Sequence, residues 1–163
     1  MQFASLEGYL TGCEMHLDAT NSRNTDIESY LVQFLLTRIC AEYETRLKIL
    51  IERRCAKTKD GHLKRFAARS AKDVSKHFSI GDLKAILGRF GDDYHKTFDD
   101  AVVNKPAHVA WDSIYSNRQA VAHGGGAQMT LTELKTAYAD SLEVLDWMAT
   151  ALALKPRDIR DLK

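Results

Sequence analysis

Apolar residues recur along the chain at intervals of three and four positions, the spacing that places side chains on one face of an α-helix. Only two prolines, Pro106 and Pro156, interrupt the 163 residues. The stretch 83–98, which contains two glycines, forms either one helix or two shorter pieces. The pattern predicts an all-α fold, a bundle of four to six helices, in a single domain that spans residues 1–163.

Residues that favour helix ends divide this pattern into segments. Thr25 with Glu28, and Thr130 with Glu133, have the three-residue separation of a capping box at a helix N-terminus. The glycine triplet 124–126 is expected to end the helix that precedes it. The expected helices cover about residues 6–17, 25–57, 63–78, 83–98, 106–123 and 131–155.

The composition narrows the class of protein. Hydrophobic residues make up 45% and charged residues 28% of the chain, which is typical of a soluble globular domain. The N-terminus has no basic start followed by an apolar run, so we expect a cytoplasmic protein without a membrane partner. Three cysteines, Cys13, Cys40 and Cys55, are odd in number and far apart, which argues against a disulfide framework and a zinc site. We expect no metal and no cofactor.

Positive charge is concentrated in one segment. Residues 53–77 carry a net charge of +7, whereas the whole chain has a formal net charge of +1. Arg65, Arg69, Lys72 and Lys76 have helical spacing and predict one cationic ridge, opposite the apolar side of its helix. Such a ridge can follow RNA phosphates by releasing counterions. A solvated helix face explains the same charges equally well.

The candidate catalytic residues are Arg118 and His123. A guanidinium is always charged and offers a fork of donors to phosphate oxygens, and imidazole exchanges protons near neutral pH. RNA supplies its own nucleophile, the 2′-hydroxyl, so cleavage needs proton transfer and charge stabilisation but no metal. Asn117 and Gln119 are candidates to orient either side chain by hydrogen bonds.

Helix geometry sets a condition on this site. Five residues of a regular helix turn about 140° beyond a full circle and rise about 7.5 Å, so Arg118 and His123 do not lie on one face. A two-fold homodimer that joins two such helix ends would place two arginines and two histidines around one groove. We therefore hypothesise a composite site at a dimer interface.

The segment from Arg118 to His123, Arg-Gln-Ala-Val-Ala-His, resembles the signature of the HEPN superfamily. That signature is an arginine, a polar residue, a short spacer and a histidine near the end of the penultimate helix. The flanking residues 114–117, the following glycine and the capped amphipathic last helix resemble it too, most closely in the RiboL-PSP-HEPN branch. Gln119 departs from the asparagine, aspartate or histidine that is commoner after the arginine.

The resemblance implies an activity. HEPN members with an intact motif are typically metal-independent endoribonucleases that act as dimers, often as toxins or in phage defence, and leave a cyclic phosphate and a 5′-hydroxyl. It therefore implies RNA as substrate, Arg118 and His123 as catalytic residues and, where the chain acts as a toxin, an antitoxin protein as a further partner.

Two further residues are secondary candidates. Some HEPN families carry an acidic residue four positions before a basic one on the second helix, and Glu42 with Arg46, or Glu44 with Lys48, has that spacing. An ordinary surface ion pair is a slightly better explanation, with Glu42 the secondary choice. Tyr115 lies near enough to the motif to stack on a base, although a core or dimer contact explains it as well.

Two rival functions remain open at this point. One is a non-catalytic HEPN-like module that binds RNA, a nucleotide or a partner protein. The other is a helical interaction protein in which Arg118 and His123 satisfy local carbonyls or carboxylates. In either case, replacing His123 would leave RNA integrity unchanged.

Overall fold

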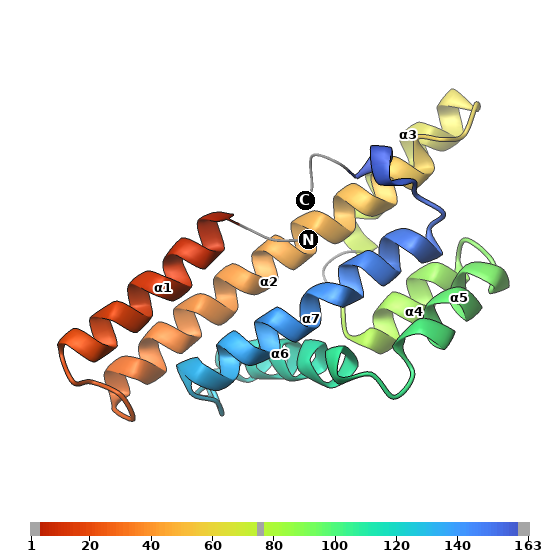
Figure 1. Cartoon of the computed structure of the whole chain (residues 1–163). Helices are drawn as coiled ribbons and strands as arrows, with labels where there is room; N and C mark the ends of the chain where they lie inside the picture. Colours follow the sequence, from red (N-terminus) through yellow and green to blue (C-terminus); the bar gives the residue numbers. More distant parts are fainter. Residues whose placement is uncertain (1–3, 75–76, 160–163) are drawn as a thin grey trace.

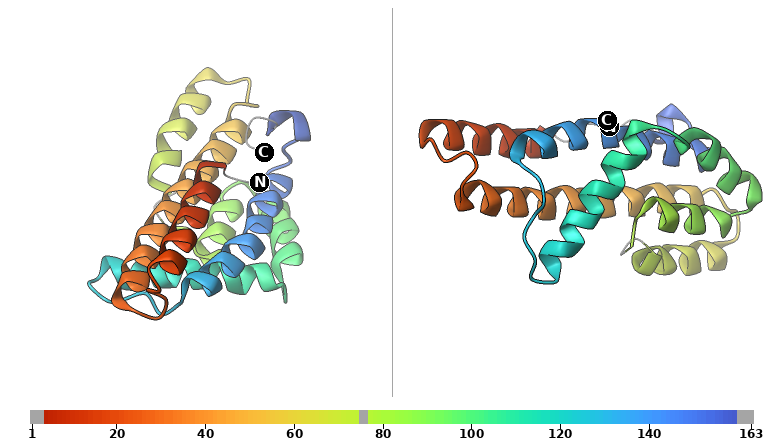
Figure 2. Two further views of the ribbon diagram at one scale, coloured as in Figure 1. Left: turned by 60° about the vertical axis from the view of Figure 1, so that its left-hand side comes forward. Right: turned by 90° about the horizontal axis from the view of Figure 1, so that it is seen from below.

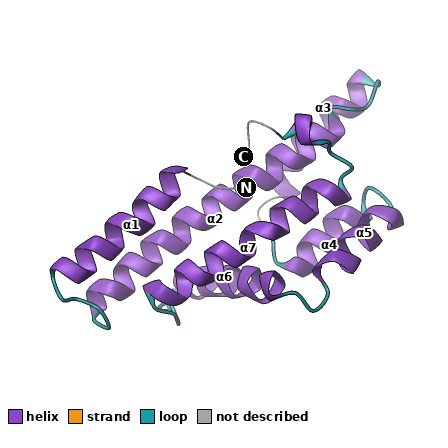
Figure 3. Cartoon of the chain, in the orientation of Figure 1, coloured by secondary structure: helices purple, strands orange, loops and turns teal. Residues whose placement is uncertain are grey.

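The computed structural model describes residues 4–74 and 77–159, and within them all regular structure is helical (Figure 3). The all-α prediction is confirmed, but the described residues form seven α-helices rather than four to six. They are α1 (Ala4–Ala19), α2 (Asp26–Cys55), α3 (Gly61–Val74), α4 (Ile80–Gly88), α5 (Asp92–Val102), α6 (Pro106–Ala122) and α7 (Leu131–Ala151), followed by the 3-10 turn η1 (Pro156–Asp158).

Three nearly parallel helices, α1, α2 and α7, set the shape of the bundle. In Figure 1, α1, α2 and α7 lie with their axes nearly parallel, and α4 and α5 pack at the end where α2 and α7 finish. Figure 2 shows α6 crossing the bundle obliquely. Helix α6 packs against both α7 and α2, so the segment that carries Arg118 is held between the two long helices.

An aromatic cluster fixes the position of α6. The ring of Trp111 stacks on that of Tyr43 from α2, with centroids 4.4 Å apart and an interplanar angle of 4°. Its indole N–H donates to the carbonyl oxygen of Phe78 at 2.6 Å. One turn of helix α4 is also tied to α6, because the Asp112 carboxylate accepts from the Ile80 N–H at 2.9 Å. These contacts anchor the helix that bears the motif.

Local sequence predicted most helix starts correctly. The Thr25 hydroxyl caps α2 by accepting from the N–H of Ile27 at 3.3 Å, and Thr130 with Glu133 forms a complete capping box at α7. The stretch 83–98 divides into α4 and α5 at Gly91, whose φ of 138° is in the region that favours glycine.

Other helix ends differ from the prediction. Helix α3 is described as far as Val74, and Phe78 is not helical. Phe78 directly precedes Ser79, which caps α4 with a non-helical ψ of 160°. Helix α7 is predicted from the sequence to reach residue 155 but ends at Ala151. There Leu154 N–H donates to the carbonyl of Ala149 at 3.0 Å and closes the helix end.

A buried carboxylate connects the first turns of α2 and α7. Glu28, only 5% exposed, accepts from the N–H of Asn24 at 2.5 Å and from the N–H of Leu131 at 2.9 Å. It therefore does not close the capping box expected with Thr25. Instead its negative charge lies at two helix N-termini, where free N–H groups and the helix dipole both favour an anion.

We expect Glu28→Ala to lower the free energy of unfolding by about 3 kcal/mol, because the Leu131 N–H would be left buried without an acceptor. Urea denaturation measures this change. Glu143→Ala, an exposed carboxylate of α7, is the matched control and should stay within about 0.5 kcal/mol of wild type. Equal stability of the two variants would contradict the role assigned to Glu28.

Candidate active site

Arg118 lies where α6 crosses α2. Its Nη2 is 3.9 Å from Oε1 of Glu44, and its Nη1 donates to Oε1 of Gln119 at 3.5 Å. The side chains of Arg118 and Glu44 are 34% and 33% exposed, so both reach solvent from a partly buried position. Burial raises the pKa of the Glu44 carboxyl, and the positive charge of Arg118 offsets part of that rise. The guanidinium is thus held by a weak, solvent-accessible ion pair.

A buried thiol, that of Cys40, lies close to this ion pair. Cys40 is 1% exposed and interacts electrostatically with both Arg118 and Glu44. Burial raises the pKa of the Cys40 thiol to about 12, although the charge of Arg118 acts in the opposite direction. The thiol therefore stays protonated at neutral pH and is a packing residue rather than a nucleophile.

A chain of polar contacts leads away from Arg118. Gln119, which accepts from Arg118, donates from Nε2 to the hydroxyl of Tyr115 at 2.8 Å. The same hydroxyl is 3.4 Å from Nδ1 of His77, which follows α3 in the chain. Tyr115 also packs edge-on against Phe78, with centroids 4.8 Å apart. Its ring is therefore partly occupied by a core contact, and its hydroxyl orients Gln119.

His123 occupies the C-cap of α6 and is exposed. The chain ends the helix in a Schellman motif: Gly124 N–H donates to the carbonyl of Val121 at 3.1 Å, and Gly125 N–H to that of Ala120 at 2.8 Å. Gly124 has the positive φ of 83° that this motif needs. The histidine thus stands at a fixed backbone position while its ring is open to solvent.

Asn117 restrains the loop between α6 and α7 through its side-chain amide, which binds backbone groups rather than Arg118 or His123 in both of its hydrogen bonds. Its Oδ1 accepts from the N–H of Gln128 at 2.6 Å, and its Nδ2 donates to the carbonyl of Ser113 at 3.0 Å. Together with the Schellman motif and the Thr130–Glu133 box, this bond restrains the loop at its start, middle and end.

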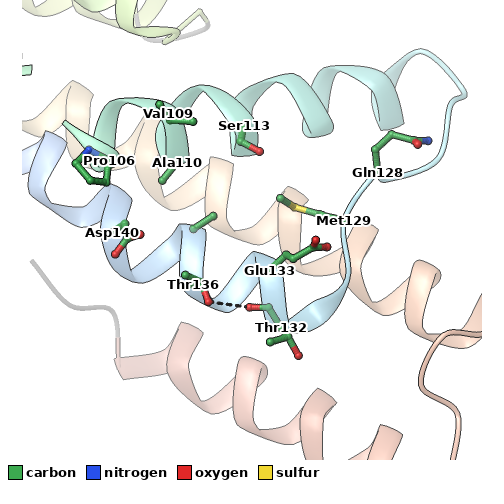
Figure 4. A pocket seen from close by; sticks show the side chains of 11 residues that line it. Pro106, Val109, Ala110, Ser113, Gln128, Met129, Thr132, Glu133, Thr136 and Asp140 are labelled. Carbon is green, nitrogen blue, oxygen red and sulfur yellow. Dashed lines mark hydrogen bonds between the residues drawn. The ribbon is translucent and has the colours of Figure 1, made fainter. Parts of the chain in front are cut away.

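A shallow groove of about 520 Å³ runs between α6 and α7 (Figure 4). Val109, Ala110 and Ser113 line it from α6, and Thr132, Thr136 and Asp140 line it from α7. Gln128, whose N–H is bound by Asn117, lines it at the motif end. Val109 is 71% exposed, so this face carries uncovered apolar surface.

Comparison with protein families decides the family. The sequence pattern of RiboL-PSP-HEPN matches residues 10–153. This chain belongs to that HEPN family. It has no match among the curated proteins or among the solved structures.

Within this HEPN fold, the structure separates the predicted site residues into two groups. Arg118, Gln119 and Tyr115 are linked by hydrogen bonds, and His123 stands one and a half turns further along. The acidic residue beside Arg118 is Glu44, not the secondary choice Glu42; Lys48, once paired with Glu44 on spacing, lies 3.9 Å from Glu52. His77, to which the sequence assigned no chemistry, joins the network through Tyr115.

The expected cationic ridge is only partly described. Arg65 and Arg69 are exposed on α3, whereas the side chain of Lys72 and the whole of Lys76 lie outside the described residues. The apolar side of this helix is not fully buried, because Phe66 is 71% exposed. Helix α3 packs mainly on α2, which is why part of its apolar side remains uncovered.

Neither a cluster of metal ligands nor a membrane-spanning helix lies within the described residues. No group of three His, Cys, Asp or Glu side chains that would hold a metal ion lies within residues 4–74 or 77–159. No helix in the same ranges is both long and apolar enough to cross a membrane.

We expect Gly124→Ala to destabilise the fold by about 1 kcal/mol, because an L-residue is strained at a φ of 83° although its Cβ would meet no atom within 4 Å. Gly126→Ala is the matched control: its Cβ also meets nothing within 4 Å, and it has no positive φ. Thermal unfolding of both variants measures the difference. A melting temperature lowered equally in both would mean that the Schellman turn does not set the position of His123.

Proposed function

We propose that this HEPN domain is a metal-independent endoribonuclease in which Arg118 and His123 act on the scissile phosphate. The observation that carries the proposal is their setting: a guanidinium held by a weak ion pair and an exposed imidazole, both near the end of one anchored helix. Membership of the HEPN family supports an RNase-like module of this kind.

The proposed reaction is an internal transfer within RNA. The 2′-oxygen attacks the adjacent phosphorus, the bond from phosphorus to the 5′-oxygen breaks, and the products are a 2′,3′-cyclic phosphate and a 5′-hydroxyl. The 2′-hydroxyl loses its proton to a base, and the leaving 5′-oxygen gains one from an acid. His123 supplies one of these transfers, and Arg118 stabilises the negative charge that grows on the phosphate oxygens.

Glu44 and Gln119 would position Arg118. The 3.9 Å separation from Glu44 is longer than a charge-assisted hydrogen bond, so a phosphate can replace the carboxylate without the cost of breaking a tight pair. Gln119, held by the Tyr115 hydroxyl at 2.8 Å, would keep the guanidinium directed outward. These are positioning roles, since neither residue needs to touch the reacting atoms.

A two-fold homodimer would complete the site. Arg118 faces α2 and His123 stands at the end of α6. Within one subunit the guanidinium and the imidazole therefore lie apart. The groove between α6 and α7 has uncovered apolar surface at Val109 and continues to the Asn117–Gln128 bond beside the motif. A second copy that meets this helix end would bring His123 of the partner subunit toward Arg118, so that the arginine of one subunit works with the histidine of the other.

The biological setting belongs to the same proposal. We propose a cytoplasmic enzyme that acts as a toxin or a phage-defence effector, with an antitoxin protein as partner when it acts as a toxin. The alternative is a non-catalytic module that binds RNA, a nucleotide or a partner protein. The observation that favours this alternative is the Arg118–Glu44 contact, because an arginine paired within the fold has a structural role.

Cleavage of a labelled RNA in EDTA by purified wild type, Arg118→Ala and His123→Ala tests the proposal, with the mass of the particle measured on each sample. We expect cleavage by wild type and a loss of about a hundredfold or more in each variant. His16→Ala is the matched control, because it replaces an exposed histidine in the last turn of α1. This variant should cleave RNA as fast as wild type does.

The other outcomes of this assay separate the alternatives. Salt-sensitive RNA binding without cleavage by wild type would favour the binding module. Equal cleavage by wild type and both motif variants would mean that the catalytic site lies elsewhere. Full activity of a stable monomer would contradict the composite site.

A further inference from the structure

A cleft between α2, α3 and α4 lies apart from the motif. Two cavities, of about 330 and 510 Å³, share the side chains of Cys55, Phe66, Arg89 and Phe90 and so form one continuous cleft. Each has the volume of a small-ligand pocket. In the right-hand view of Figure 2, α3 and α4 lie next to each other, at the end of the bundle away from α1.

Aromatic rings form part of the cleft wall. Phe66 is 71% exposed although it lines both cavities, so its ring contributes little to the stability of the core and is available to a ligand. Phe90 lines the same cavities from the turn that follows α4 and packs partly against the core. Flat aromatic surfaces that are open to solvent bind nucleobases by stacking.

The charged residues that line the cleft are all positive. Arg54, Lys57 and Arg89 line it, and no acidic side chain does so among the described residues. Lys57 is engaged by Asp158 at 2.8 Å, and the guanidinium of Arg54 lies over the ring of Tyr94 at 5.2 Å. The cleft therefore favours an anion beside an apolar surface.

One donor in this wall lacks a partner. The Nε–H of Arg54 is buried and makes no hydrogen bond to any residue that the structure describes. A buried guanidinium donor without an acceptor is costly, and an anionic oxygen would satisfy it. This observation points to a ligand independently of the exposed ring of Phe66.

The cleft and the motif open on one side of α2. Glu44, which faces Arg118, is eleven residues before Cys55, which lines the cleft. Eleven residues return to within about 20° of the starting direction after three turns and rise about 16 Å. Ile51, seven residues after Glu44, lies on the same stripe and also lines the cleft. A chain bound at Arg118 can thus continue along α2 into the cleft.

We propose that this cleft binds one unstacked nucleotide of single-stranded RNA, with its base against Phe66 and Phe90 and its phosphate at Arg54 and Arg89. It is a second RNA subsite, about three helical turns from Glu44. The inference takes only the identity of the ligand as RNA from the proposed function, since the cleft holds no residue of the catalytic motif.

Binding of a fluorescein-labelled 2′-O-methyl RNA oligonucleotide tests the subsite by fluorescence anisotropy. This probe lacks the 2′-hydroxyl nucleophile, so affinity is measured whether or not the protein cleaves RNA. We expect Phe66→Ala and Arg89→Ala each to weaken binding about tenfold, and Phe66→Trp to retain it, because a tryptophan also stacks on a base. Tyr30→Ala is the matched control, an aromatic residue 67% exposed near the opposite end of α2, and should bind as wild type.

The results distinguish this inference from the proposed function. Normal affinity of Phe66→Ala and Arg89→Ala, with intact melting temperatures, would overturn the subsite even if wild type cleaves RNA. Equal loss of affinity in the Tyr30→Ala control would overturn it as well. Loss confined to the cleft variants would support the subsite even if wild type shows no cleavage.

Discussion

The hydrogen bond from the Leu131 N–H to the Glu28 carboxylate is the constraint on which the motif end of the bundle depends. Glu28 is buried and accepts from the start of α2 and the start of α7, so it fixes where α7 begins relative to α2. The loop that follows His123 ends at this point. Its other restraints, the Schellman turn and the Asn117–Gln128 bond, are local and would not by themselves set the position of α6 against α2.

Helix α2 carries the residues that contact α6, Arg118 and the proposed RNA subsite. Near its middle, Tyr43 stacks on Trp111 and holds α6, and one residue later Glu44 meets Arg118. Further along the same stripe, Ile51 and Cys55 form the floor of the cleft under α3. One long helix thus carries a buried packing contact and, on one stripe of its surface, both the neighbour of the motif arginine and two residues of the proposed RNA subsite.

The features predicted from the sequence are those that depend on a few neighbouring residues. Thr25, Thr130 and Pro106 begin helices because their effects act within one turn, and the apolar period of three and four gave the all-α class. Helix number was underestimated because the division at Gly91 was left open. The exposure of Phe66 was not predictable either, because it depends on which helices cover α3.

The candidate site shows the same division between local and long-range information. Arg118 and His123 stand out in the sequence through their chemistry and spacing, and the motif led to the family. Glu42 and Glu44 both have the required spacing, and the crossing of α6 over α2 decides that Glu44 is the neighbour of Arg118. His77 lies 38 residues from Tyr115 in the chain, and no local pattern brings the two together.

A mixed dimer of one Arg118→Ala subunit and one His123→Ala subunit tests the composite site most directly. The two chains carry different affinity tags, are co-expressed and are purified through both tags, and cleavage of labelled RNA is measured in EDTA. The account predicts that the mixed dimer cleaves about tenfold or more faster than either homodimeric variant, because an intact Arg118 then faces an intact histidine across the interface. A mixed dimer as inactive as both parents, beside an active wild type, would contradict a site shared between subunits.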